Sequence, residues 1–377
     1  MGSRVTAVLL HRGMTDSTTP PRGMVRRKLW TPRHVQVTAE QPHTAEILRR
    51  LERAGVDDVR VLRSNRLMDL KDGSDREVYA RAKATMAVAV APPSAIKPQP
   101  IPPSADWRID LARGCPAHCQ YCYLAGSLAG PPVTHVYANL DEVLAGIGTH
   151  VGRGTVTTGT AARGHEGTTF QLSCYTDPLA IEHLTGSLAE AIERVGTGLY
   201  GDASVRFTTK FDAVDDLLTL SHGRRTRMRV SINSDDVAGR FEGGTVTFPA
   251  RIGVLRTMAQ AGYPVGLTVA PIMPIGDWRA AYAAVLDNVA AAVDGLPDLD
   301  LTVEAITHRF MPSSKDVLQG WYPRTRLDMD EARRTRKRTK FGSTKYVYPR
   351  ELMTELRHWF EDAVAVRLPG APLLYWT

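Results

Sequence analysis

Short apolar segments alternate with longer amphipathic segments along the chain from residue 107 onward. The short segments have the length and apolar content of buried strands, and the longer ones repeat apolar residues with helical spacing. The alternation of strand and helix predicts parallel pairing with right-handed crossovers. Six units are too few for the usual eight-stranded barrel, so we expect an α/β fold with a partial (β/α)6 barrel of the triosephosphate isomerase kind over 107–322. The predicted strands are 107–113, 168–175, 204–210, 227–233, 263–272 and 298–306, and the predicted helices are 139–148, 181–195, 211–221, 249–262 and 278–293.

The segments before this array have different patterns. Residues 33–91 predict a small N-terminal α/β region, with a helix at 44–55 and strands at 59–64 and 85–91. Residues 92–106 contain six prolines and predict an irregular connector. Residues 1–32 are rich in Pro, Arg and Thr without periodicity, which predicts a flexible arm.

The Gly-rich stretch at 153–169 lacks the spacing and the following helix of a phosphate-binding loop. We expect it to be a surface loop. His183 lies within a predicted helix, and we expect it to be structural rather than a ligand.

Positive charge is concentrated near the C-terminus. The chain has 47 Lys and Arg against 40 Asp and Glu, and residues 324–350 alone contain ten basic and three acidic residues. Phe341, Tyr346 and Tyr348 lie among these cations. Clustered cations bind phosphates and aromatic faces stack on unpaired bases, so 323–377 is predicted to be a DNA-binding segment with a β-hairpin that turns at Gly342 to Thr344. The alternative is a solvated helix face over 328–338 followed by an ordinary hairpin.

The four cysteines and the apolar runs limit the class of protein. Three cysteines lie within eight positions, which is not a disulfide framework and indicates metal or redox chemistry in a reducing compartment. No run approaches the roughly 18 apolar residues of a membrane span, and the first apolar stretch is too short for a secretory signal. We therefore expect a cytoplasmic protein that acts without a membrane.

Cys115, Cys119 and Cys122 follow a C-x3-C-x2-C pattern in the loop after the first predicted barrel strand. Three thiolates suit a [4Fe–4S] cluster that leaves one iron open to a small molecule. A zinc ion with His118 as fourth ligand is the alternative. The fourth cysteine, Cys174, lies alone after the second strand, where a small buried apolar role is also open to it.

These motifs carry a family resemblance. The cysteine loop "GCPAHCQYCYL", with an aromatic residue before its last cysteine, resembles the radical S-adenosylmethionine (SAM) superfamily. Together with "SCYTDPLAIEHLTGSL", "RFTTKFDAVDDLL", "RVSIN", "AGYPVGLTVAPI", "HRFMPSSKDVL" and "YPRTRLDMDEARRTRKRTKFGSTKYVY", in that order over 107–377, it resembles the spore photoproduct lyase family. Residues 1–90 resemble the family only weakly.

The resemblance implies a DNA repair lyase for UV-induced thymine dimers. Cys115, Cys119 and Cys122 would hold the [4Fe–4S] cluster, and reduction by a donor such as a flavodoxin or ferredoxin would cleave SAM to a 5′-deoxyadenosyl radical. That radical removes hydrogen from the lesion, the bond between the bases breaks, and Cys174 returns a hydrogen atom. Tyr121 and Tyr123 match tyrosines that return the radical towards SAM. The matching SAM-binding positions are Thr176, Lys210, Ser231, Asn233 and Ala270.

The family's hairpin wedges the duplex so that the lesion can be extruded. The residues expected to bind DNA are Arg333, Arg334, Arg336, Lys337, Arg338, Lys340, Phe341, Lys345 and Tyr346. The family typically has an Arg-Tyr pair where this chain has Lys340-Phe341, which changes the hydrogen bonding near the lesion. Three alternatives stay open: repair of cyclobutane pyrimidine dimers, a radical SAM enzyme acting on RNA or a peptide, and a non-catalytic zinc-containing DNA-binding protein.

Overall fold

The computed structural model describes residues 29–377 apart from 39, 65, 69, 71, 124, 129, 158–160 and 339–341, and it describes only the backbone of 161–162. Residues 1–28 of the predicted arm therefore lie outside the described residues. Among the described helices, none has the length and apolar character needed to cross a bilayer.

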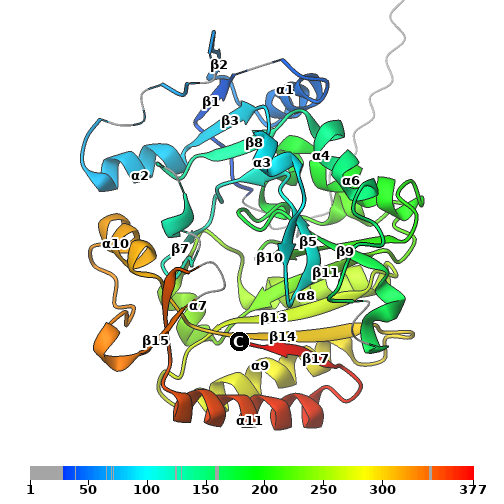
Figure 1. Ribbon diagram of the computed structural model, residues 1–377, viewed down its shortest axis with the longest axis vertical. Helices are drawn as coiled ribbons and strands as arrows, with labels where there is room; N and C mark the ends of the chain where they lie inside the picture. Colours follow the sequence, from blue (N-terminus) through cyan, green and yellow to red (C-terminus); the bar gives the residue numbers. More distant parts are fainter. Residues whose placement is uncertain are drawn as a thin grey trace, which may run out of the picture.

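An eight-stranded sheet forms the centre of the molecule (Figure 1). Its middle six strands are the six predicted strands, paired in chain order and all parallel, which confirms the partial barrel. Every residue of the second and fourth of these strands is buried, as in a parallel sheet covered on both faces. The six strands are β5 (Ala105–Ile109), β9 (Thr168–Leu172), β10 (Ala203–Thr209), β11 (Thr226–Ile232), β13 (Val265–Ile272) and β14 (Leu301–Thr307).

Two strands that the pattern did not predict extend the edges of this sheet. β4 (Gln99–Ile101) pairs antiparallel with β5, and β17 (Leu373–Trp376) pairs parallel with β14. β4 lies within the predicted connector 92–106, which also contains the short helix α3 (Pro93–Ile96). The expectation of an irregular connector is therefore wrong, because an edge strand can contain a proline such as Pro100 without disrupting a central ladder.

Three predicted helices are confirmed on the outside of the sheet, and a fourth joins them. They are α4 (Leu140–Gly148), α8 (Phe248–Gln260) and α9 (Trp278–Val293), and α11 (Arg350–Arg367) lies beside α9 (Figure 1). α9 buries Tyr282, Leu286 and Val289, which follow one another at helical spacing along its inner face.

Two predicted helices differ in the structure. Residues 181–195 are divided at Gly186, whose φ of 66° ends α5 (Glu182–Thr185) before α6 (Ser187–Gly196) begins. Residues 211–221 contain only a 3-10 turn at Asp215–Leu217. Val214 and Leu217 are nevertheless buried, so their helical spacing reflects an irregular loop that packs against the barrel.

The N-terminal region and the barrel share a second sheet. The predicted first strand, 107–113, divides: the chain leaves the barrel sheet after β5, and β6 (Ala112–Arg113) pairs antiparallel with β8 (Thr134–Tyr137). β8 in turn pairs with β3 of the N-terminal region. The boundary at 92–106 therefore does not separate two sheets. The other elements of this region are β1 (His34–Val37), α1 (Thr44–Arg53), β2 (Val59–Val61), α2 (Asp75–Lys83) and β3 (Thr85–Ala89).

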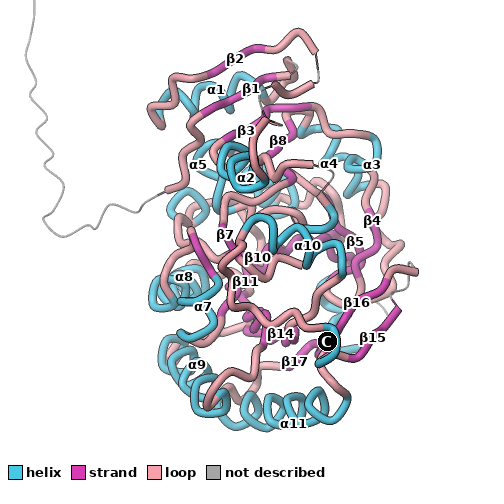
Figure 2. The backbone as a smooth tube through the Cα atoms, turned by 90° about the vertical axis from the view of Figure 1, so that its left-hand side faces the viewer, coloured by secondary structure: helices cyan, strands magenta, loops and turns pink. Residues whose placement is uncertain are grey.

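The C-terminal segment forms the predicted hairpin. β15 (Thr335–Arg338) pairs antiparallel with β16 (Thr344–Val347), and Gly342 in the connection has a φ of 81°. The helix considered for 328–338 is absent, because those residues form a 3-10 turn at Glu331–Arg333 and then β15. α10 (Pro312–Trp321) precedes the hairpin, and Figure 2 shows the hairpin close to the C-terminus.

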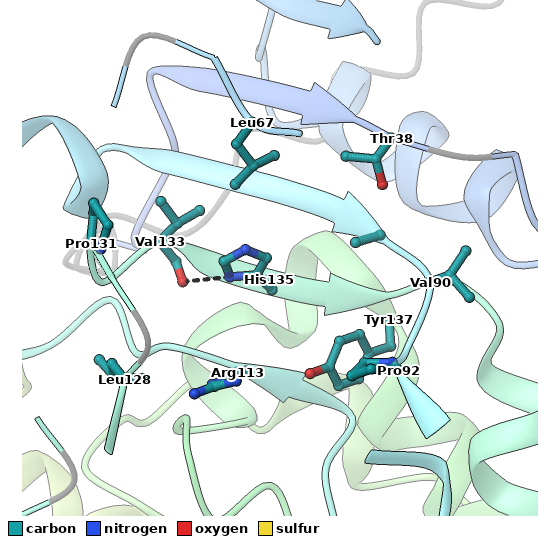
Figure 3. A pocket seen from close by; sticks show the side chains of 11 residues that line it. Thr38, Leu67, Val90, Pro92, Arg113, Leu128, Pro131, Val133, His135 and Tyr137 are labelled. Atoms are coloured by element: carbon teal, nitrogen blue, oxygen red, sulfur yellow. Dashed lines mark hydrogen bonds between the residues drawn. The ribbon is translucent and has the colours of Figure 1, made fainter. Parts of the chain in front are cut away.

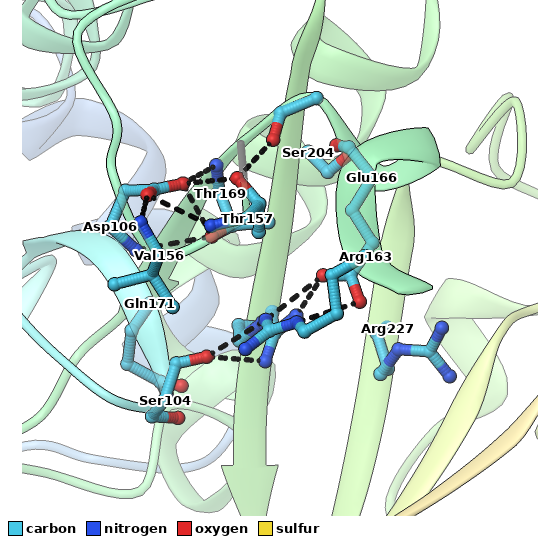
Figure 4. A network of polar contacts seen from close by, with 12 residues as sticks. Ser104, Asp106, Val156, Thr157, Arg163, Glu166, Thr169, Gln171, Ser204 and Arg227 are labelled. Atoms are coloured by element: carbon cyan, nitrogen blue, oxygen red, sulfur yellow. Dashed lines mark hydrogen bonds and ion pairs between the residues drawn. The ribbon is translucent and has the colours of Figure 1, made fainter. Parts of the chain in front are cut away.

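The Gly-rich stretch 153–169 is anchored rather than loosely exposed (Figure 4). Asp106, near the start of β5, accepts hydrogen bonds from the N–H groups of Val156 (2.6 Å) and Thr169 (2.9 Å) and from the Thr157 hydroxyl (2.7 Å). Thr157 and Arg163 of this stretch are buried. Arg153 and Thr155 are exposed, so the stretch lies at the surface as expected, and Thr157 and Arg163 attach it to the barrel.

Candidate active site

The three clustered cysteines lie in the loop that follows β6. Gly114 has a φ of 81°, and a Cβ there would lie 2.1 Å from the Val133 carbonyl oxygen, so only glycine fits. Its N–H donates to the carbonyl of Tyr175 (3.1 Å), which follows Cys174. The short strand β7 (His118–Cys119) pairs with β12 (Glu242–Gly243). The loop is thereby connected both to the segment after β9 and to the segment after α7 (Asp235–Phe241).

A buried lysine from the N-terminal region supports this loop. Lys83, the last residue of α2, is 8% exposed, and its ammonium group donates to the carbonyls of Cys115 and Ala117. Burial lowers the pKa of Lys83, and the thiols of all three clustered cysteines oppose this shift. The lysine therefore lies within electrostatic reach of the whole cysteine group.

The thiols themselves suit a cluster of several irons. All three are half-buried and free, and burial, opposed by Lys210 and assisted by the other two thiols, raises the pKa of Cys119 to about 12. Within the described ranges no three His, Cys, Asp or Glu side chains converge as the ligands of one metal ion do. His118 Nδ1 is also bonded to the Tyr79 hydroxyl (2.7 Å). Three thiolates are soft donors and fit an iron–sulfur cluster, while His118 already has a hydrogen-bond partner in Tyr79.

Charged side chains from segments that follow the barrel strands lie around Tyr121. Its hydroxyl donates to Glu242, whose carboxylate also pairs with Lys210 (3.4 Å) and Arg251 (2.6 Å). The Lys210 ammonium lies 5.8 Å from the centre of the Tyr121 ring. Burial and the neighbouring Cys119 and Glu242 raise the pKa of Tyr121 well above its ordinary value, so this phenol holds its proton.

Cys174 lies at the carboxyl end of β9, separate from the cysteine loop. Ser173 has a φ of 56°, a left-handed conformation, and turns the chain directly after the strand. The N–H of Cys174 donates to Asp110 Oδ1 (2.9 Å). Burial, assisted by Asp110 and opposed by Arg108 and Arg229, raises the pKa of the Cys174 thiol to about 12. The thiol therefore keeps its hydrogen at neutral pH.

The raised pKa of Cys174 predicts slow alkylation. Only the thiolate attacks iodoacetamide, so at about pH 9 the native thiol should react at least ~100-fold more slowly than the same cysteine in the unfolded chain. Mass spectrometry of the peptide that contains Cys174, with protein in urea as the reference, measures both rates. A native rate within ~10-fold of the unfolded rate would contradict the protonated state.

The predicted SAM-binding residues gather at the carboxyl ends of β9, β10, β11 and β13. The Thr176 hydroxyl is buried and has no hydrogen-bond partner among the described residues, so it is available to a ligand. Lys210 donates to the Ser231 hydroxyl (2.5 Å), and Ala270 is half-buried on β13. Asn233 differs, because its amide already bonds the Pro271 carbonyl (2.8 Å) and accepts from the Tyr282 hydroxyl (2.8 Å).

The predicted DNA-binding residues divide into two groups. Arg336, Lys337 and Arg338 are exposed along β15, and exposed Arg333 pairs with Asp328 (3.0 Å). Arg334 instead turns inward, where it donates to the His308 carbonyl (3.1 Å) and lies 3.9 Å from the centre of the Tyr348 ring. The guanidinium of Arg334 therefore already has partners within the protein, unlike the side chains exposed along β15.

The second hairpin strand is half-buried. Tyr346 stacks on Phe310 (5.4 Å between ring centres), which fastens the hairpin to the barrel rather than leaving the ring free for a base. Burial and the nearby cations Arg309 and Lys337 lower the pKa of Lys345. Arg309 also lies 5.1 Å from the centre of the Tyr123 ring, which links the base of the hairpin to the cysteine loop. Lys340 and Phe341 lie outside the described residues.

A cavity of about 260 Å³ lies beside the sheet of the N-terminal region (Figure 3). Arg113 of β6 and His135 and Tyr137 of β8 line it, and His135 Nδ1 is bonded to the Val133 carbonyl (3.1 Å). The predicted ligands and catalytic groups are not among its lining residues.

Three polar residues of the site were not predicted from sequence. Lys83 and Glu242 contact the cysteine loop from elements far away along the chain, and Arg251 pairs with Glu242. Each is an ordinary charged residue in its local sequence. His183, in contrast, has the structural role expected of it, because its Nε2 bonds the carbonyl of Trp30 (2.9 Å).

A family model described as spore photoproduct lyase matches residues 31–377. The chain belongs to the spore photoproduct lyase family. As a member of this family it is an enzyme of the lyase class.

Curated relatives and solved structures support this membership. The spore photoproduct lyase of Geobacillus sp. (strain Y412MC61) is 35% identical over 336 residues, which cover 89% of this chain and 95% of the relative. That of Bacillus subtilis (strain 168) is 33% identical over 338 residues, covering 90% and 95%. A solved spore photoproduct lyase variant with bound AdoMet and dinucleoside spore photoproduct has a TM-score of 0.83 and 35% identity, and the match covers 93% of this chain and 100% of that chain.

Proposed function

We propose that this chain repairs the spore photoproduct in UV-damaged DNA by radical SAM chemistry, with Cys174 as the hydrogen-atom donor. The observation that carries the proposal is the division of the cysteines. Three half-buried thiols share one loop, and the fourth remains protonated on a neighbouring strand end that is joined to that loop through Gly114 and Tyr175.

Cys115, Cys119 and Cys122 would hold the [4Fe–4S] cluster, and the cluster with SAM, when bound, supplies a 5′-deoxyadenosyl radical. The half-buried loop limits access of water to these thiols. The unpartnered Thr176 hydroxyl and the Lys210 ammonium are the groups best suited to orient a zwitterionic ligand beside them. The solved relative with bound AdoMet supports SAM as the ligand.

Cys174 would complete the repair on the lesion. A thiol transfers a hydrogen atom only while it carries one, and a thiolate bound to metal carries none. Burial and Asp110 maintain the S–H form, and the turn at Ser173 keeps the side chain apart from the three cluster cysteines. Tyr121 and Tyr123 would then return the radical towards SAM: a tyrosine hydrogen atom would pass to the Cys174 thiyl radical, and the tyrosyl radical would recover a hydrogen atom from 5′-deoxyadenosine. The bond from Tyr121 to Glu242 orients that phenol.

DNA would contact the exposed strand of the hairpin. Replacing Lys337 and Arg338 with Gln removes two exposed charges, so the slope of log affinity against log salt should fall by up to ~1.8 for duplex DNA. Filter binding between about 50 and 200 mM salt measures the slope. Arg49→Gln/Arg357→Gln, which removes two exposed charges from α1 and α11, is the matched control. An unchanged slope in the hairpin variant, or an equal fall in the control, would count against this surface.

The choice of lesion is tested directly with defined oligonucleotides. The reduced enzyme and SAM are incubated with one oligonucleotide that contains a spore photoproduct and another that contains a cyclobutane dimer, and thymine recovery is followed by chromatography. We expect repair of the spore photoproduct, the ligand named in the solved relatives. Preferential repair of the cyclobutane dimer would instead support the change at Lys340-Phe341 as a determinant of specificity.

Anaerobic reconstitution tests the cofactor separately. With iron and sulfide the protein should turn brown and, under dithionite, cleave SAM even without a lesion. Retention of zinc alone would support the non-catalytic alternative. Flavodoxin and ferredoxin can be compared as electron donors in the same assay.

A further inference from the structure

We infer that Lys83 is a positioning residue for the cluster: it holds the Cys115–Ala117 backbone and its charge makes the cluster easier to reduce. The inference rests on the proposed function, because it assumes that the three thiols bind a [4Fe–4S] cluster. It assigns a role to a residue of the N-terminal region, outside the barrel and its motifs.

The contacts of the Lys83 side chain support the first part of the inference, that Lys83 positions the backbone of the cysteine loop. The Lys83 ammonium donates hydrogen bonds to the carbonyls of Cys115 and Ala117. Both residues belong to the turn that contains the first cysteine. Two of its three N–H donors are thus used on this turn. The Tyr79 ring, one helical turn earlier on α2, lies 5.7 Å from the ammonium and covers it. A side chain that is 8% exposed and doubly bonded holds one conformation, so the turn is held with it.

The positive charge of Lys83 supports the second part of the inference, that the cluster becomes easier to reduce. A cluster gains one negative charge when it is reduced, so a neighbouring cation stabilises the reduced form more than the oxidised form. The Lys83 ammonium is bonded to the carbonyl of Cys115, one of the three thiol residues, so its charge lies beside the cluster site. Because the ammonium is buried, salt screens this interaction little. Lys210, a second cation near the loop, pairs with the buried Glu242 (3.4 Å).

Three substitutions separate the two parts. Lys83→Gln keeps amide donors for the carbonyls and removes the charge, Lys83→Arg keeps the charge, and Lys83→Met removes both. Lys97→Gln, at an exposed lysine after α3, is the control for loss of a distant charge. The readouts are iron and sulfide content per chain and the midpoint potential of the cluster, measured by redox titration followed by electron paramagnetic resonance.

We expect Lys83→Gln to bind as much iron as the parent protein but to have a more negative midpoint potential. The equilibrium constant for reduction of the cluster should fall ~10-fold, which corresponds to 59 mV for a one-electron couple. Lys83→Arg and Lys97→Gln should keep the parent potential, and Lys83→Met should lose most of its iron. A fully loaded Lys83→Gln or Lys83→Met with the parent potential overturns the inference. Loss of iron from Lys83→Arg in a folded protein also overturns it, because that variant keeps both charge and donors.

Failure of the proposed function would give a different experimental result from failure of the inference about Lys83. If the unsubstituted protein binds no cluster after anaerobic reconstitution, the proposed function fails. If it binds the cluster and the neutral variants leave iron content and potential unchanged, only the role of Lys83 fails.

Discussion

Replacing Cys174 with Ala should leave SAM cleavage within ~3-fold of the parent enzyme while the yield of intact thymine falls ~10-fold or more. The cluster cysteines are untouched in this variant, so the radical still forms and still attacks the lesion. Without the protonated thiol that burial and Asp110 maintain, the product radical must take hydrogen or another atom from elsewhere. Chromatography of the digested oligonucleotide, with 5′-deoxyadenosine measured in the same sample, gives both quantities.

Cys174→Ser is the matched control for shape. A serine fills nearly the same volume and can bond the same neighbours, but its O–H bond is too strong for easy transfer of the hydrogen atom. We therefore expect the serine variant to behave like the alanine variant. Intact thymine at the parent level in either variant would show that another group donates the hydrogen.

Replacing Cys119 with Ala should abolish repair and SAM cleavage together. Changing residues that only support a metal ligand typically lowers affinity or activity by 10–100-fold, so loss of a ligand itself should cost at least ~100-fold. Cys119 also belongs to β7, whose pairing with β12 positions Glu242 beside Tyr121. Iron content, absorbance of the reconstituted protein and production of 5′-deoxyadenosine are the measurements.

Cys174→Ala serves as the control for Cys119→Ala, because both variants lose one thiol. We expect the first to bind as much iron as the parent and the second to bind little. Equal iron in the two variants would mean that Cys119 is not a ligand, and the division of the four cysteines into three and one would have to be abandoned.

The pattern of apolar residues along the chain predicted most of the barrel but not the charged side chains that are buried inside it. Parallel strands need apolar residues on both faces, and that requirement is visible in the sequence as short apolar runs. Arg206, Arg229 and Glu304 lie on three of these strands and are almost fully buried, with Arg206 and Glu304 3.5 Å apart. In the local sequence each of them interrupts an apolar run. Their partners lie on other strands, so the local pattern does not show that they are buried.

The places where prediction failed have the same origin. Residues 211–221 have helical apolar spacing but form an irregular loop, and Asp106 anchors the Gly-rich stretch, an attachment that the local pattern did not indicate. In both cases a contact with a distant element outweighs local preference. The division of the first strand into β5 and β6 likewise depends on β8, which lies beyond the cysteine loop.

The sequence by itself determined the positions of the six barrel strands, the hairpin and the cysteine loop with Cys174 after the next strand. Each of these elements depends on residues that are close along the chain, where periodicity and spacing act. Only the tertiary structure decided that Lys83 supports the cysteine loop, that Glu242 joins Tyr121 to Arg251, and that Arg334 turns inward. A charged residue selects its partner by proximity in the folded chain, and that proximity depends on sheet pairing, which local spacing does not specify.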